Sequence, residues 1–182
     1  MVNPIDAWHQ EHMDFKRLLD VLQQEVDRFS TGESPNYQLM LDVLEYLRDY
    51  SDQSHHPRED EALRRLAKRC PDRELPIARL MQEHRVIAHA GENLRKLLEE
   101  VVADAVVSRA EVEVAAATYL VYYGNHIARE EEDILPRAAQ ALTAADWQAV
   151  RDAVPARHDP LFGKQPEERF RALRQRIAAE AA

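Results

Sequence analysis

Apolar residues recur every three or four positions along four long stretches of the chain, and this spacing predicts four long α-helices. The first stripe runs from Ile5 to Phe29 and ends at the helix-breaking cluster S-T-G-E-S-P. The four predicted helices cover about residues 4–29, 36–70, 75–103 and 108–137. Pro57 lies inside the second helix and removes one backbone hydrogen bond, so we expect a kink or short break near His55 and His56.

Shorter helices are predicted after the four long ones. Thr143 and Asp146 are typical of a helix start, and a turn-rich segment then leads into a charged helix at about residues 167–180. Four long helices with short loops predict an all-α protein, an antiparallel up-down-up-down four-helix bundle with additional short C-terminal helices. We expect the bundle to occupy residues 1–154 and a C-terminal helical extension to occupy residues 155–182.

Composition agrees with long helices and narrows the class of function. The chain has only four glycines, and its formal net charge of −9 argues against a nucleic-acid groove, which needs a basic stripe. It has no run of about 18 apolar residues that could span a membrane, and its start does not resemble a signal peptide. Cys70 is the single cysteine, so no internal disulfide is expected. We therefore expect a soluble cytoplasmic protein that binds neither nucleic acid nor membrane.

Each long helix carries a histidine on its apolar stripe, and two helices add a glutamate four residues later. Residues four apart share one helix face, so each His/Glu pair can point to one place. The two local sequences, H-H-P-R-E-D-E and H-I-A-R-E-E-E, also match each other. A single core histidine is more often a hydrogen-bonded packing residue, but six such groups without metal would leave buried polar groups unsatisfied. The sequence therefore predicts six metal ligands: His12, His55, Glu59, His84, His126 and Glu130.

The donor types and their number narrow the choice of metal. Nitrogen and carboxylate ligands without thiolate suit iron, manganese or zinc. A single tetrahedral zinc needs four ligands, whereas six are available here. Two ions bridged by both glutamates would use all six and leave positions for a bridging oxygen and a small molecule. The count favours a carboxylate-bridged pair of iron ions, with manganese or zinc as substitutes. The neighbouring acids Asp60, Glu131 and Glu132 are expected to be solvated.

Four motifs taken in order resemble the hemerythrin-like, or HHE cation-binding, family. They are E-H-M-D-F, H-H-P-R-E-D-E, E-H-R-V-I and H-I-A-R-E-E-E-D-I-L-P, and the resemblance covers roughly residues 5–140. It implies an antiparallel four-helix bundle that holds a non-haem, oxo- or hydroxo-bridged di-iron centre, and it implies the same six ligands. Members of the family bind dioxygen, sense oxygen or iron, or handle nitric oxide and peroxide.

The chain departs from the oxygen-carrying members of that family in the third helix. Those members use five histidines, two of them four residues apart on this helix, but Ala88 stands four residues after His84. His89 is expected to face away from the site. His56 is the first candidate for a fifth ligand and His9 the second, although a surface position or a contact with a ligand is the favoured interpretation for each.

Two tyrosines precede His126 by about one turn. Core packing is the usual role of such residues, and a hydrogen bond to a ligand or to a bound molecule is the functional alternative for Tyr122 and Tyr123.

The main hypothesis is a di-iron protein that binds or senses dioxygen or a related diatomic molecule, because no acid–base or substrate-binding motif surrounds the predicted metals. A di-iron peroxidase or nitric oxide reductase is one alternative. An iron-responsive interaction module is another, in which the arginine-rich C-terminal helix binds a partner. Whether the protein is an enzyme stays open, with a binding or sensing role favoured, and no oligomeric state is predicted.

Overall fold

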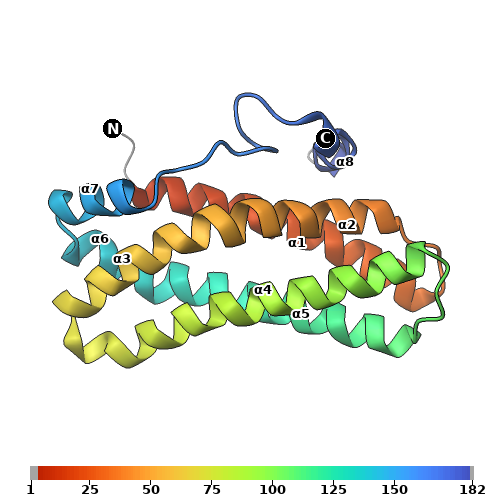
Figure 1. Ribbon diagram of the computed structural model, residues 1–182, viewed down its shortest axis with the longest axis horizontal. Coiled ribbons are helices and arrows are strands. Elements are labelled where there is room, and N and C mark those ends of the chain that lie inside the picture. Colours follow the sequence, from red (N-terminus) through yellow and green to blue (C-terminus); the bar gives the residue numbers. More distant parts are fainter. Residues whose placement is uncertain (1–3, 181–182) are drawn as a thin grey trace.

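The computed structural model of the chain describes residues 4–180, and every regular element in that range is a helix. The long helices lie side by side (Figure 1), and in chain order they group into four rods. Their elements are α1 (Pro4–Thr31) in rod 1; α2 (Tyr37–Tyr46), the π-helix η1 (Leu47–His55) and α3 (His56–Arg69) in rod 2; the 3-10 turn η2 (Pro71–Arg73) and α4 (Glu74–Val102) in rod 3; and α5 (Arg109–Arg129), the π-helix η3 (Glu130–Ile134) and α6 (Leu135–Ala141) in rod 4. The prediction of an all-α protein is confirmed. Within residues 4–180 no helix is both long enough and apolar enough to cross a bilayer.

The first rod ends where the sequence places a glycine. Gly32 has a φ of +88°, a left-handed conformation that side chains other than glycine's rarely adopt. Its N–H donates to the carbonyl of Phe29 at 3.2 Å, and the N–H of Glu33 donates to the carbonyl of Arg28 at 2.9 Å. These bonds satisfy carbonyl groups that the end of the helix would otherwise leave free.

Rod 2 stays continuous through Pro57, so the predicted break does not occur. The N–H of His56, immediately before the proline, donates to the carbonyl of Ser51, five residues back. This hydrogen bond spans five residues instead of the four of an α-helix, so the helix is wider at this point. The wider helix tolerates a proline, which has no N–H of its own. The adjacent residues His55 and His56 at this point are both buried.

Rod 4 repeats this arrangement before its own proline. The N–H of Leu135 donates to the carbonyl of Glu130, again five residues back, and Pro136 follows. η1 therefore ends on the predicted ligand His55, and η3 begins on the predicted ligand Glu130. Short π-helical segments within longer helices are frequent at functional sites.

Two clusters of apolar side chains fill the interior. The larger one includes Phe15, Tyr46, Ile87 and Tyr123. The smaller one is built mainly from Trp8, Leu63, Leu66, Leu80, Ile134 and Leu135. In every rod the predicted ligands lie between a residue of one cluster and a residue of the other, as His12 lies between Trp8 and Phe15. The polar candidates therefore form one layer inside an otherwise apolar core.

Two further helices cover the outside of the rods. α7 (Ala144–Ala153) packs against α3 and begins with a capping box, in which Thr143 and Asp146 bond each other's backbone N–H, as predicted. The 3-10 turn η4 (Glu168–Phe170) is followed by α8 (Arg171–Glu180), which lies against α1 and α2 toward the opposite end of the rods from α7 (Figure 1). Phe170 and Leu173 are buried in the larger cluster, so this C-terminal segment packs on the bundle.

Candidate metal centre

The structure brings all six predicted ligand side chains into one buried layer, where each is at most 5 % exposed. The Nε2 atoms of His12 and His55 lie 3.0 Å apart, and the Nε2 of His55 lies 3.1 Å from Glu59 Oε2. On the other side, the Nε2 atoms of His126 and His84 lie 3.3 and 3.5 Å from Glu130 Oε1. These side chains come from all four rods and point to a common centre.

The layer divides into two groups that share a carboxylate. His12, His55 and Glu59 form the first group. The second group consists of His56, His84, His126 and the same Glu59. Within each group the potential ligand atoms lie within 4.8 Å of one another. Glu130 also lies between the groups, because its two oxygens are each 3.5 Å from an Nε2, that of His12 and that of His84. Both glutamates therefore occupy positions from which they can bridge two ions.

A ring of carboxylates orients the four predicted histidines. In each case the Nδ1 atom contacts an acid from the neighbouring rod, which leaves the Nε2 atom directed to the centre. The contacts run around the bundle from Glu11 on α1 to His55, from Asp60 on α3 to His84 at 2.8 Å, from Glu83 on α4 to His126 at 3.2 Å, and from Glu131 on η3 to His12 at 2.7 Å. Metal-bound histidines commonly donate their other N–H to a carboxylate in this way.

Two arginines hold two of these acids. Arg58 Nη2 lies 2.7 Å from Glu11 Oε2, and Arg129 Nη1 lies 2.6 Å from Glu83 Oε1. Each arginine immediately precedes one of the two predicted glutamate ligands. The matched sequences H-H-P-R-E and H-I-A-R-E therefore share one order: a histidine ligand, an arginine that binds a supporting acid, and a glutamate ligand. The repeat seen in the sequence is therefore a repeat in structure as well.

The hydrogen bonding of this layer is incomplete in a way that fits cations. Within residues 4–180, both carboxylate oxygens of Glu59, one of Glu130 and the Nε2 atoms of His84 and His126 are buried without a hydrogen-bond partner. A neutral imidazole that donates from Nδ1 has a lone pair on Nε2. The facing Nε2 atoms of His12 and His55 would then present two lone pairs to each other. Positive ions bound between these donors satisfy every one of them.

The charges of the layer also indicate a site that suits cations. Burial lowers the pKa of His12, but its contacts with Glu131 and Glu59 outweigh burial and raise the pKa to about 10. The contacts of His84 with Asp60 and Glu130 likewise overcome burial and raise its pKa to about 10. Acids at this position attract positive charge, as protons or as metal ions, and metal ions displace the protons when they bind.

His56 joins the second group, as the first candidate for a fifth ligand. Its ring stacks on that of His84 with centroids 4.2 Å apart and an angle of 10° between the planes. Its Nδ1 lies 3.2 Å from Asp52 Oδ1, and its Nε2 lies 3.2 Å from Ser51 Oγ. Burial lowers the pKa of His56 well below its usual range, so the ring is neutral, the form in which imidazole binds metals.

The two tyrosine candidates separate clearly. The hydroxyl of Tyr123 is buried and lies 2.5 Å from Ser51 Oγ, which in turn contacts His56. Tyr122 is 47 % exposed, so its proposed contact with a ligand is wrong. Residue 122 is about 100° around the helix from residue 123, and this rotation carries its ring to the surface.

His9, the second candidate for a fifth ligand, lies outside the cluster, in agreement with the favoured interpretation: its side chain is 58 % exposed and its Nδ1 contacts Glu131 Oε2 at 2.8 Å. One other expectation needs correction. Asp60 and Glu131 are not simply solvated acids, since each contacts a buried histidine of the next rod. His89 is exposed, as expected.

The supporting role of the acids and arginines around the histidines was not predicted from the sequence. Glu11 and Glu83 each immediately precede a predicted histidine ligand, and Asp60 and Glu131 each immediately follow a predicted glutamate ligand. A neighbouring residue is turned by about 100° on the helix, toward an adjacent helix of a bundle. The repeated pairing of an acid with a ligand was therefore the signal that could have identified them.

A small cavity of about 10 Å³ lies beside the two glutamates. Its other lining residues are apolar: Trp8, Ala62, Leu63, Leu66, Ile134, Leu135 and Ala138. A cavity needs about 10–15 Å³ to hold a single water molecule. The space beside the glutamates is therefore suited to one very small molecule.

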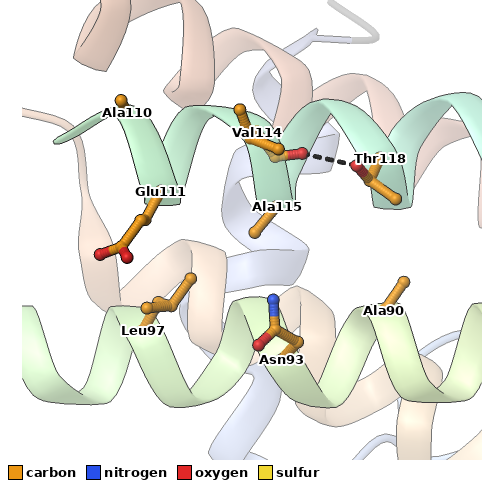
Figure 2. Close-up of a pocket in the computed structure, with 8 residues that line it drawn as sticks. All are labelled: Ala90, Asn93, Leu97, Ala110, Glu111, Val114, Ala115 and Thr118. Atoms are coloured by element: carbon orange, nitrogen blue, oxygen red, sulfur yellow. Dashed lines mark hydrogen bonds between the residues drawn. The ribbon is translucent and has the colours of Figure 1, made fainter. Parts of the chain in front are cut away.

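A wider groove lies elsewhere, between α4 and α5 (Figure 2). It is lined by Ala90, Asn93, Leu97, Ala110, Glu111, Val114, Ala115 and Thr118. The hydroxyl of Thr118 donates to the carbonyl of Val114 at 2.7 Å, within its own helix. No histidine lines this groove, so it is separate from the layer of candidate ligands.

Comparison with known proteins supports the metal-binding interpretation. A family model described as the hemerythrin HHE cation binding domain matches residues 3–138. No curated protein matches the chain. The matched region is most of the chain, and it contains every side chain of the two groups. With its buried His/Glu cluster and its helical fold, the chain belongs to the hemerythrin HHE cation-binding family.

Proposed function

We propose that the protein is a non-haem di-iron protein that binds or senses dioxygen or a related diatomic molecule. The observation that carries this proposal is the orientation of the histidines. Four buried imidazoles on four rods each place Nδ1 on a carboxylate and direct Nε2 to one centre with two shared glutamates. In this proposal the four rods form the antiparallel up-down-up-down bundle that the sequence predicts.

The donors divide unequally between the two ions. His12 and His55 would hold the first ion, and His56, His84 and His126 would hold the second. Glu59 and Glu130 would bridge them. When bound, iron would supply the electrons and the free coordination position that a diatomic ligand needs. The first ion would have one fewer protein donor, so an external molecule would find room on the side of His12 and His55.

The residues around this centre act by excluding water and by limiting size. The cavity beside Glu59 and Glu130 is otherwise apolar and has room for one very small molecule. Its lining offers no further group that could exchange a proton with a substrate. This environment supports binding or sensing more than acid–base catalysis.

Two measurements test the proposal. Metal analysis of freshly purified protein should give two iron ions per chain. The anaerobically reduced protein should gain a new absorption band with oxygen and lose it when oxygen is removed, over repeated cycles. Irreversible oxidation without such a band would contradict reversible binding. Steady consumption of peroxide or nitric oxide would support the enzymatic alternatives in its place.

A further inference from the structure

The only two tryptophans of the chain meet at one end of the metal layer. Trp8 on α1 is 4 % exposed, and its ring lies between those of His55 and Trp147. The centroid distances are 6.3 Å to His55 and 5.4 Å to Trp147, and both contacts are edge-to-face. A large, rigid side chain therefore stands between a predicted ligand and the helix α7 on the surface.

Trp8 also lines two separate hollows, an inner cavity and an outer pocket. On its inner side is the cavity of about 10 Å³ beside Glu59 and Glu130. On its outer side is a surface pocket of about 160 Å³ between the start of α1, α3 and α7. Among residues 4–180, Trp8 is the one residue that lines both hollows. The indole thus separates an apolar space at the metal layer from a pocket open to the outside.

The outer pocket favours small neutral molecules. Most of its lining is apolar, and its charged residues are Arg58 and Arg151. Arg58 is occupied by its ion pair with Glu11. A molecule such as dioxygen loses few hydrogen bonds with water when it enters such a pocket, whereas a larger polar molecule loses many.

The outer wall belongs to a part of the chain that the family match does not include. The match ends at residue 138, and α7, which carries Trp147 and Val150, begins at Ala144. The capping box fixes the start of α7, and an ion pair between Arg69 Nη2 and Asp146 Oδ2 at 2.6 Å holds that start on α3. The packing of Trp147 on Trp8 is therefore a feature of this chain beyond the shared domain.

We propose that Trp8 is the gate of the access route to the metal centre, and that Trp147 of α7 holds it closed. The size of the indole sets the largest ligand that reaches the ions. Diatomic molecules pass during small movements of the ring, and larger ligands are excluded. The identity of the ligand rests on the proposed function, but the route and its gate do not.

One test follows tryptophan fluorescence, which arises only from the two residues of the gate. A Trp147→Phe variant leaves Trp8 as the single reporter and keeps an aromatic ring of α7 packed against it, so the gate should stay closed. Dissolved oxygen should quench its emission and the bulkier acrylamide should not. Adding Asp146→Ala, which removes the capping box and the bridge to Arg69, should raise acrylamide quenching severalfold. Equal quenching by acrylamide in both variants would overturn the role of α7.

A second test follows ligand entry in the oxidised iron-loaded protein by absorption. Trp8→Ala should speed the association of imidazole by about tenfold or more, and that of the smaller azide by less, because a close-packed ring is the barrier. Leu66→Ala is the matched control, since Leu66 lines the inner cavity but not the outer pocket. Trp8→Phe should fall between wild type and Trp8→Ala, and it serves if the alanine variant fails to fold.

The outcomes separate the gate from the proposed function. Unchanged association rates in Trp8→Ala and Trp8→Phe, or an equal gain in Leu66→Ala, would overturn the gate even if dioxygen binds reversibly. The predicted order of rates in a protein that does not respond to dioxygen would support the gate and refute the diatomic ligand. The expected result is that the difference in association rate between azide and imidazole is lost in Trp8→Ala and in no other variant.

Discussion

The two halves of the metal centre follow one plan and differ at one position. Aligning H-H-P-R-E with H-I-A-R-E pairs the first histidines, the arginines and the glutamates of rods 2 and 4. The second position is His56 in rod 2 and Ile127 in rod 4. His56 reaches the half of His84 and His126, which thereby has three imidazoles against two. A nearly symmetric scaffold thus contains two unequal sets of potential metal ligands, and a single residue makes the difference.

The halves also differ in their contact with water. The side chain of Arg58, which holds Glu11, is 11 % exposed, whereas that of Arg129, which holds Glu83, is 45 % exposed. The half with fewer donors is therefore the drier one. A coordination position left free on an ion in this half would lie where electrostatic interactions are least screened.

Removing a shared glutamate should have the largest effect, because it breaks both halves at once. Glu59 belongs to both groups of donors, so Glu59→Ala should lose most of both iron ions, as should Glu130→Ala. Iron analysis after purification measures the loss. His158→Ala is the control, because His158 is exposed and bonds the carbonyl of Gln165. Near-normal iron in Glu59→Ala would contradict a bridging role.

Exchanging the residues at the differing position should remove the asymmetry. His56→Ile leaves two imidazoles in each half. The substitution should lower the affinity for one ion by more than about 100-fold. Losing a residue that only hydrogen-bonds to a metal ligand already lowers metal affinity by about 10–100-fold. The reciprocal Ile127→His adds a donor to the first half, so the protein should keep its iron and lose azide binding. Titration with a chelator and the absorption spectrum measure these effects. Equal loss of both ions in His56→Ile would argue against separate donor sets.

Removing one supporting acid should have a moderate effect that differs between the halves. Glu11→Ala frees Nδ1 of His55 and leaves Arg58 half-buried without its partner. We expect the affinity of the first ion to fall by about 10–100-fold. Glu83→Ala should cost less, because Arg129 remains solvated. Chelator competition on both variants tests the order, and a larger loss in Glu83→Ala would contradict it.

The smallest effect concerns pH and the metal-free protein. The pKa of His12 and of His84 is raised from 6.5 to about 10, so their protonation stabilises the metal-free fold fully below pH 6.5. That contribution is lost as the pH rises toward 10. Iron displaces these protons, so its stabilisation grows with pH. Melting temperatures should therefore diverge between loaded and metal-free protein as the pH rises, and parallel curves would refute this account.

Helical periodicity was enough to locate most of the site. His12, His84 and His126 lie on apolar stripes of ordinary α-helix, where the spacing of residues fixes the direction of each side chain. The order of four such stripes then predicted the all-α fold. This part of the structure depends on local geometry, which a sequence states directly.

The missing parts depend on geometry that the spacing of an α-helix does not contain. His55 and His56 point about 100° apart on the helix and only His55 lies on the predicted apolar stripe, yet the packing of the four rods buries both. The acids Glu11 and Asp60 reach histidines of other rods, so their role depends on the distance between rods. These distances are set by the packing of the rods. In the sequence alone, an acid next to a ligand cannot be told from an acid that is exposed to solvent.

The closed ring of acid-to-histidine contacts has a mechanical consequence for assembly. Because each rod both supports its neighbour and is supported by the previous one, no rod can slide along the bundle axis without releasing contacts on two sides. When only two or three rods have docked, the ring of acid-to-histidine contacts is incomplete. Metal capture is thus coupled to the last docking step of folding, and amide protons at this level of all four rods should exchange together rather than one helix at a time.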